Sequence, residues 1–229
     1  MGPTDLSADI LVFDLDGTLV QLDFTKSGME KVRADLQSVF SEAGVSRDFK
    51  PLLAELDETL NELSAQLEQH AVDDLRRRAF EKIATMERDA VSRQHVYPAA
   101  RPLLEKLGQS TTQVAVATNN TRAAATESIR LAGFPEPDYL VALDDVGKPK
   151  PNPDMIELLF AKFDQSPESI GMVGDRLSDA ESMHHACEDK EARATTILLD
   201  RENREDQNAP IIDYNIESLT EMSDFISIK

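Results

Sequence analysis

The chain has 229 residues, 41% of them hydrophobic, which is enough to bury a sizeable core and excludes a globally disordered chain. Its formal net charge is −19, from 43 acidic and 24 basic residues. Such a surface repels the phosphate backbone of a nucleic acid and the headgroups of an anionic membrane, so we expect neither among its partners. Two explanations of the acidity stay open: a solvated surface that aids solubility, or an adaptation to high salt.

Targeting signals and cysteines indicate the compartment. No apolar run approaches the length of a transmembrane helix, and the first ten residues, MGPTDLSADI, lack the basic start and apolar stretch of a secretory signal. The single cysteine, Cys187, excludes an internal disulfide and is consistent with a reducing interior. We therefore predict a cytoplasmic protein.

The first predicted element is a strand at residues 9–14, because the apolar run in DILVFD is continuous, as in a strand that is buried on both faces. Residues 21–96 have a different character. Apolar residues recur there at helical spacing between charged ones, in segments that begin at Met29, Leu52 and Leu75. This region is predicted to form about three helices.

After Tyr97 and Pro98, helices and strands alternate. The predicted helices cover residues 100–107, 121–131, 154–163 and 178–187, and the strands QVAVAT, YLVALD, SIGMVGD and ATTILLD follow them in turn. A short closing strand is expected at 211–212, before a last helix at 218–225. This alternation predicts an α/β fold with a doubly wound, Rossmann-like parallel sheet. Residues 1–19 and 97–229 would form this α/β core, interrupted by a helical insert at 20–96.

Polar side chains follow the carboxyl ends of the predicted strands, where open parallel sheets bind ligands. They are Asp14 and Asp16, Thr118 and Asn119, Lys148 in the following loop, and Asp175 and Asp179. Side chains two apart on an extended backbone point the same way, so Asp14 and Asp16 can face one pocket, with Gly17 freeing the turn. With Asp175 as a third carboxylate, these like charges favour a hard divalent cation such as Mg²⁺ over the alternative of simple helix caps.

A metal and a phosphate together suggest a reaction. A carboxylate can attack phosphorus and form an acyl phosphate, while a second carboxyl group protonates the leaving alkoxide and later activates water. Positive charge must then meet the phosphoryl oxygens in the transition state. Lys148 and the metal could provide it, helped by backbone N–H groups around Gly17 and by the Thr118 hydroxyl.

The sequence resembles the haloacid dehalogenase superfamily of phosphatases, because DLDGT, ATNN, GKPKPNPD and GDRLSD match the four short motifs of that family in order. The resemblance implies Mg²⁺, held by the Asp14 carboxylate, the backbone carbonyl of Asp16 and Asp175. It also implies these roles: Asp14 as nucleophile, Asp16 as general acid and base, Thr118 as phosphate ligand, Asn119 beside the substrate, Lys148 as catalytic lysine and Asp179 as a supporting acid.

Several residues have competing interpretations. Lys150 is the alternative to Lys148 as the catalytic lysine. We favour Lys148 because Gly147 precedes it where the loop begins. The remaining polar candidates are interpreted as structural: Arg122 as a solvent-facing residue, Arg176 as a local ion-pair partner, and the adjacent His184 and His185, which point about 100° apart on a helix.

The helical insert resembles the cap of phosphoglycolate phosphatase-like proteins and of beta-phosphoglucomutase. Such caps close over the pocket and contact the leaving group. Asp16 favours phosphoryl transfer over dehalogenation. The resemblance therefore implies a Mg²⁺-dependent phosphatase whose partner is a small phosphorylated metabolite, in a monomer or a homodimer. A phosphomutase, or a non-catalytic regulator that binds a phosphometabolite, are the alternatives.

Overall fold

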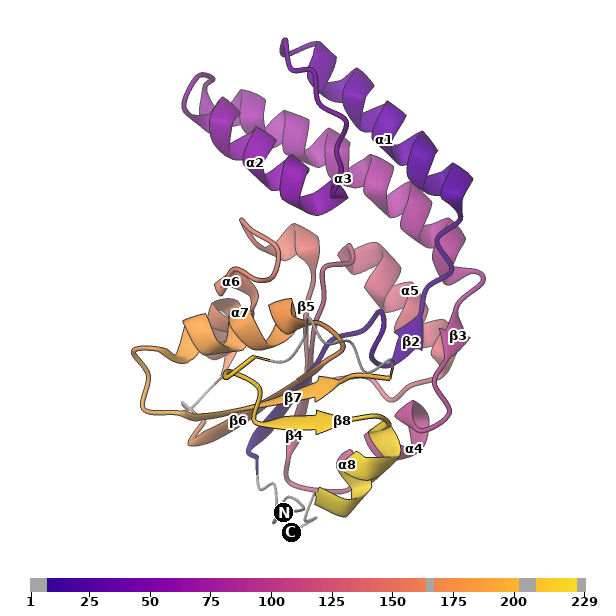
Figure 1. The fold of residues 1–229 in the computed structure, drawn as a ribbon, viewed down its shortest axis with the longest axis vertical. Helices are drawn as coiled ribbons and strands as arrows, with labels where there is room; N and C mark the ends of the chain where they lie inside the picture. Colours follow the sequence, from indigo (N-terminus) through magenta and orange to yellow (C-terminus); the bar gives the residue numbers. More distant parts are fainter. Residues whose placement is uncertain (1–7, 164–166, 202–208, 226–229) are drawn as a thin grey trace. The chain divides into compact units, whose positions relative to one another are not determined.

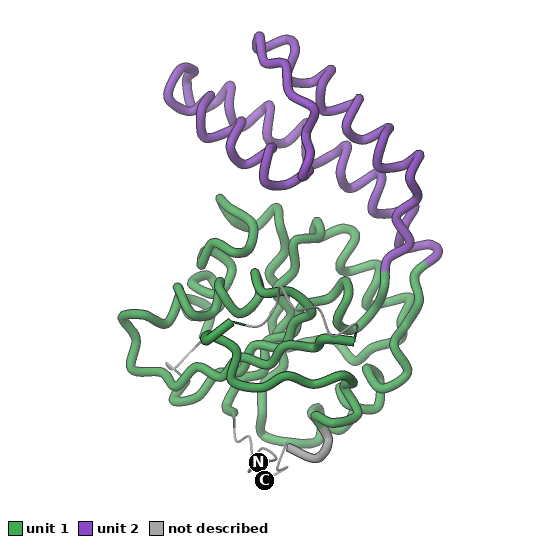
Figure 2. Tube along the Cα trace, viewed as in Figure 1, with its two compact units in different colours: residues 1–21, 94–229 green, residues 22–93 purple. Residues whose placement is uncertain are grey.

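The computed structural model describes residues 8–163, 167–201 and 209–225 of the chain (Figure 1). Within these ranges, no helix is both long enough and apolar enough to span a membrane. The expectation that no signal peptide is present falls largely on residues 1–7, which lie outside the described residues. The chain divides into two compact units, which we call unit 1 (residues 1–21 and 94–229) and unit 2 (residues 22–93), coloured green and purple in Figure 2.

Unit 1 is built on a six-stranded parallel sheet in the order β5-β4-β1-β6-β7-β8. This confirms the predicted α/β fold. From β1 the chain adds β4 and β5 on one flank of that strand and then β6, β7 and β8 on the other. The carboxyl ends of β1, β4 and β6 therefore lie where the strand order reverses. The strands are β1 (Ile10–Phe13), β4 (Gln113–Ala117), β5 (Tyr139–Val141), β6 (Ser169–Gly174), β7 (Arg193–Leu199) and β8 (Tyr214–Ile216).

Helices cover the sheet on both sides, which explains the continuous apolar sequence of β1. On one side, Ile10 and Val12 pack in a cluster with Met155 of α6 and Met183 of α7. Leu11 and the other residues of β1 are buried as well. The helices of unit 1 are α4 (Ala100–Leu107), α5 (Arg122–Ala132), α6 (Asp154–Lys162), α7 (Leu177–Cys187) and α8 (Leu219–Phe225).

Two strands end or begin elsewhere than predicted, and side-chain hydrogen bonds explain both differences. β5 ends at Val141 because the Asp145 carboxylate accepts a hydrogen bond from the Ala142 N–H at 2.8 Å, which turns the chain into a 3-10 helix, η1 (Leu143–Asp145). β8 lies at 214–216, after the predicted 211–212. The Thr196 hydroxyl binds the Ile211 carbonyl, so this segment forms a turn before the strand begins.

A short antiparallel ribbon marks the junction of the two units. It pairs β2 (Val20–Gln21) with β3 (His95–Val96). Two-residue strands carry too little periodicity to be predicted. Because this ribbon belongs to unit 1, the division lies after residues 21 and 93, whereas the predicted boundaries follow residues 19 and 96.

Unit 2 contains the three predicted helices, α1 (Lys26–Ser41), α2 (Leu52–Ser64) and α3 (Gln69–Val91). The side chain of Thr25 accepts a hydrogen bond from the Gly28 N–H at 3.1 Å and begins α1. The apolar faces of the helices form one buried cluster, which includes Phe40 of α1, Leu60 of α2 and Ile83 of α3. Unit 2 therefore has a hydrophobic core of its own.

Candidate active site

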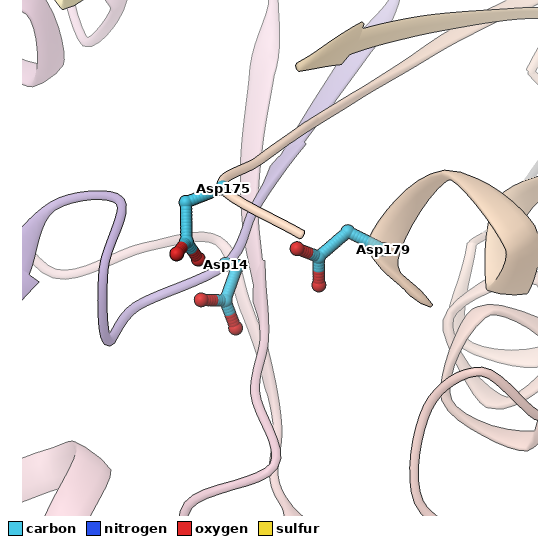
Figure 3. Close-up of side chains that lie close together, drawn as sticks. All are labelled: Asp14, Asp175 and Asp179. Atoms are coloured by element: carbon cyan, nitrogen blue, oxygen red, sulfur yellow. The ribbon is translucent and has the colours of Figure 1, made fainter. Parts of the chain in front are cut away.

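Three buried carboxylates meet at the carboxyl edge of the sheet. Asp14 follows β1, Asp175 follows the neighbouring strand β6, and Asp179 lies in the first turn of α7. One oxygen of each lies within 4.8 Å of the others (Figure 3). Each residue is at most 8% exposed, so water screens their mutual repulsion poorly. The pairing of β1 with β6 is what brings the first and fourth sequence motifs together.

Lys150, and not the predicted Lys148, reaches this cluster. Its Nζ lies 2.7 Å from Asp14 Oδ1, 2.5 Å from Asp179 Oδ1 and 2.8 Å from the carbonyl oxygen of Ala117. These three acceptors match the three protons of an ammonium group. Lys148 is exposed, and its backbone N–H donates to the Asp154 carboxylate at 3.1 Å. The assignment of Lys148 is therefore corrected to Lys150.

Asn119 contacts the backbone of Lys150 through both ends of its amide. Its Oδ1 accepts the Lys150 N–H at 2.9 Å, and its Nδ2 donates to the Lys150 carbonyl at 3.2 Å. This pair of hydrogen bonds holds the backbone of Lys150 at the end of β4. The Asn119 amide thus contacts the Lys150 backbone, and its place beside the substrate stays a prediction.

Thr118 lies at the end of β4, fully buried beside Asn120. Its hydroxyl donates to Asn120 Oδ1 at 2.9 Å and accepts the Asn120 N–H at 3.2 Å. Asn120 was not singled out from the sequence, although the repeated asparagine in ATNN was a visible signal. Its contact fixes the orientation of the Thr118 hydroxyl.

The loop after β1 contains Asp16 and Gly17. Asp16 is half-buried and is not one of the three carboxylates that lie within 4.8 Å of one another, so its sharing a pocket with Asp14 stays a prediction. Gly17 has φ +91°, and a Cβ there would lie 2.5 Å from the Asp175 carboxylate, so only glycine fits. The Gly17 N–H donates to the Val20 carbonyl at 2.7 Å, and the use of N–H groups around Gly17 for a phosphate stays a prediction.

The electrostatics of the cluster favour a cation. The pKa of Asp14 is raised to about 8, mainly by burial. The neighbouring carboxylates of Asp179 and Asp175 also raise it, whereas Lys150 lowers it. Burial alone would lower the pKa of Lys150, but the two aspartates that it contacts raise it. When Asp14 is ionised, one ammonium group cannot balance three buried carboxylates, and a bound divalent cation would favour that ionised form. The donor set consists of hard oxygen atoms, which fits Mg²⁺.

Other polar residues near the motifs have local partners. Arg122 forms an ion pair with Asp145 and donates to the Leu140 carbonyl at 2.8 Å. The side chain of Arg176 is 70% exposed, with Nε 4.0 Å from Asp175. His184 and His185 are exposed on α7. These positions agree with the structural interpretations made from the sequence.

Comparison with known sequences yields a family and several relatives. The sequence model of the haloacid dehalogenase-like hydrolase family matches residues 8–186. "Probable phosphatase IndB" of Dickeya dadantii is 31% identical over 180 residues, which cover 74% of each chain. Pyrophosphatase PpaX of Bacillus velezensis is 24% identical over 228 residues, which cover 99% of this chain and 100% of the relative.

Solved structures share the fold. CbbY from Rhodobacter sphaeroides, in complex with xylulose-(1,5)bisphosphate, aligns with a TM-score of 0.64 at 18% identity and covers 96% of this chain and 100% of its own. YfnB from Bacillus subtilis, bound to magnesium, aligns with a TM-score of 0.55 at 17% identity, over 96% and 98% of the two chains. At these identities the likeness concerns the fold alone.

Proposed function

Because the chain belongs to the haloacid dehalogenase-like hydrolases, we propose that it is a Mg²⁺-dependent phosphatase that hydrolyses a small phosphomonoester through a phosphoryl group on Asp14. The observation that carries this proposal is the contact of Asp14 with Lys150 inside a buried cluster of three carboxylates. A nucleophilic carboxylate, a fixed cation and a site for a divalent ion are the groups that phosphoryl transfer requires.

We assign the metal to Asp14 and Asp175, with the backbone carbonyl of Asp16 as the family resemblance implies. Asp179 is better suited to hold Lys150, since its Oδ1 accepts from Nζ and its Oδ2 accepts from the Arg176 N–H at 3.0 Å. Bound Mg²⁺ would neutralise charge on the phosphoryl oxygens. A magnesium-bound structure of the fold relative YfnB supports this choice of ion.

In the proposed first step, one carboxylate oxygen of Asp14 attacks phosphorus. The bond from phosphorus to the ester oxygen breaks, and Asp16 gives its proton to the leaving alkoxide. In the second step, Asp16 takes a proton from water, the water oxygen attacks phosphorus, and Asp14 is released with inorganic phosphate. Lys150 balances the negative charge that builds up beside Asp14 in both steps.

The chemistry of two relatives supports a choice of substrates to test. CbbY binds a sugar bisphosphate and PpaX is a pyrophosphatase, so sugar phosphates, phosphoglycolate, nucleoside monophosphates and pyrophosphate are the compounds to test. We propose that unit 2 acts as the cap that selects among them. A cytoplasmic location and a monomeric or homodimeric state stay predictions from the sequence.

A panel of these compounds, assayed for phosphate release with Mg²⁺ and with a chelator, tests the function. We expect release with at least one small compound and with a generic aryl phosphate, lost with the chelator. Asp14→Asn should abolish it, while Asp189→Asn, at an exposed position of the same unit, should not. If no compound is hydrolysed at low or at high salt, the proposal fails.

A further inference from the structure

Arg201 contacts the loop that carries Asp16. It lies just after the carboxyl end of β7, the strand next to β6, and is half-buried. Its guanidinium group donates from Nη1 to the Gly17 carbonyl and from Nη2 to the Thr18 carbonyl, the latter at 3.0 Å. One planar group therefore holds two successive carbonyls in the segment that follows Asp16.

This segment depends on Gly17 for its shape, and Arg201 adds contacts from the segment after β7 to the hydrogen bonds within the loop, such as that from the Gly17 N–H to the Val20 carbonyl. Gly17 has a positive φ and approaches the Asp175 carboxylate closely enough to exclude a Cβ. Glycine restrains its own backbone least of all residues, so its conformation must be imposed from outside. The hydrogen bonds from Arg201 fix the peptide group immediately after Gly17 and thereby limit where the preceding residue, Asp16, can lie.

Tyr97 completes the arrangement. The Arg201 guanidinium lies over the Tyr97 ring, 3.5 Å from its centroid, a stacked geometry that orients the guanidinium group. Tyr97 is attached to the same loop, because its N–H donates to the Leu19 carbonyl at 3.2 Å and its hydroxyl to Gln21 Oε1 at 3.0 Å. Arg201 thus contacts the loop after β1 directly, through the carbonyls of Gly17 and Thr18, and indirectly, through the Tyr97 ring.

The charge of Arg201 is retained in this position. Partial burial lowers the pKa of its guanidinium, while Tyr97 and Asp175 act in the opposite direction. An arginine stays protonated at any physiological pH. Arg201 therefore donates to the two loop carbonyls as a cation.

We propose that Arg201 is a positioning residue for catalysis, which holds the Asp16–Thr18 segment in the geometry that proton transfer by Asp16 and metal binding at its carbonyl require. This role rests on the proposed function. Arg201 touches neither substrate nor phosphorus; it acts through the loop. Arg201 belongs to none of the four sequence motifs and lies more than twenty residues beyond the last of them.

The test compares Arg201→Ala and Arg201→Lys with a matched control, Arg101→Ala. Arg101 also donates to a backbone carbonyl, that of Ala132 at the C-terminal end of α5, at the opposite edge of the sheet from the site. For each protein, kcat and KM are measured with an aryl phosphate, Mg²⁺ affinity by calorimetric titration of the metal-free protein, and folding by thermal unfolding. Guanidinium, at concentrations far below those that unfold the protein, is then added to Arg201→Ala.

A positioning role predicts that Arg201→Ala lowers kcat by about 10-fold to 100-fold with KM within about threefold, since small displacements in a site cost this much. Mg²⁺ affinity should fall, added guanidinium should restore part of kcat, and Arg201→Lys should be intermediate because it supplies one point charge in place of a planar fork. Arg101→Ala should match the wild type in kcat and in Mg²⁺ affinity.

The inference is overturned if Arg201→Ala equals Arg101→Ala in kcat and Mg²⁺ affinity, or if its loss of activity only follows the unfolded fraction and guanidinium restores nothing. Failure of the proposed function has a different signature: the wild type itself would release no phosphate. In that case the calorimetric comparison of Mg²⁺ affinity still decides whether Arg201 organises the loop.

Discussion

Lys150 and Lys148 lie two positions apart in the same loop but have opposite surroundings. Lys150 is 5% exposed and donates to Asp14, Asp179 and a backbone carbonyl, whereas the side chain of Lys148 is in solvent. Replacing Lys150 by methionine keeps the length of the side chain and removes its charge. Transition-state stabilisation by this cation is then lost, together with the charge balance of the cluster.

We therefore expect Lys150→Met to lower kcat by about 10²–10³-fold, the usual cost of removing one preorganised electrostatic donor. Lys148→Met is the matched control and should stay within about twofold of the wild type, because surface substitutions away from such features have small effects. Steady-state kinetics on an aryl phosphate measures both. A loss confined to Lys148→Met would restore the assignment made from the sequence, and equal losses in the two variants would contradict a selective role of Lys150.

Asn119 gives a second prediction at this scale. Asn119→Ala removes both hydrogen bonds to the Lys150 backbone, so the ammonium group should move and kcat should fall by about 10-fold to 100-fold. Asn152→Ala is the control, because Asn152 lies in the same loop and also donates to a carbonyl, that of Pro149 at 3.0 Å. A similar effect of both substitutions would mean that the loop as a whole, and not the Asn119 pairing, matters.

The sequence motifs predicted the carboxylates but not the lysine, for a physical reason. Asp14 and Asp175 directly follow buried strands, so their place at the sheet edge follows from the strand pattern alone. Lys148 and Lys150 are both followed by proline in an irregular loop, where no periodicity says which side chain turns inward. That choice depends on Asn119, a contact across 31 positions of sequence that no local pattern encodes.

At the scale of elements, the ion pair of Arg122 with Asp145 joins the start of α5 to η1. Partial burial would raise the pKa of Asp145, but hydrogen bonds from Arg122 and from the Ala142 N–H outweigh it and hold the pKa below its usual value. A carboxylate with a lowered pKa stabilises the fold above its unfolded-state pKa. This contribution is lost as the pH falls through the folded-state pKa.

Asp145→Asn should therefore lower the free energy of unfolding by about 1 kcal/mol at pH 7, a value reduced from that of buried charged hydrogen bonds because the pair is partly exposed. At an acidic pH below this lowered folded-state pKa, the wild-type carboxyl group is protonated, and the difference from the variant should shrink towards zero. Urea unfolding at both pH values measures this. A difference that stays constant or grows on acidification would contradict the assigned role of the ion pair.

Helices long enough to repeat their apolar residues were predicted well from the sequence, whereas two-residue strands were not. α4 and α1–α3 repeat apolar residues over two or more turns, and their buried faces follow that repeat. β2 and β3 have two residues each, and their pairing joins Val20, which precedes unit 2 in the chain, to Val96, which follows it. The sequence prediction placed the end of β5 too late in the chain. A hydrogen bond from the Ala142 N–H to the Asp145 side chain ends the strand, and strand propensity does not report such a contact.

At the scale of the whole molecule, the excess negative charge is unevenly distributed. Unit 1 has 28 acidic and 13 basic residues, whereas unit 2 has 15 acidic and 11 basic. Ion pairs occur within unit 2, for example Arg77 with Asp74 and Glu81 on α3, and Arg47 of the loop before α2 with Glu55, Glu58 and Glu62. Self-repulsion therefore acts mainly on unit 1, which contains the proposed active site.

Salt should relieve this repulsion. The Debye length falls from about 10 Å at 0.1 M to about 3 Å at 1 M ionic strength, so we expect the Tm to rise with KCl over this range. A gain of one to two kcal/mol corresponds to about 2–8 °C for a chain of this size. Calorimetry at constant pH measures it. A Tm that does not change with KCl would leave solubility as the sole role of the acidic surface.

The most direct test is to trap the phosphoryl group on Asp14. Asp16→Asn should slow hydrolysis of the intermediate, and an aryl phosphate with a good leaving group should still form it. Borohydride reduces an acyl phosphate to an alcohol, so quenching during turnover with Mg²⁺ and sequencing the peptides by mass spectrometry should find homoserine at position 14. An unmodified Asp14 in the presence of sustained turnover, or reduction at another carboxylate, would contradict the account.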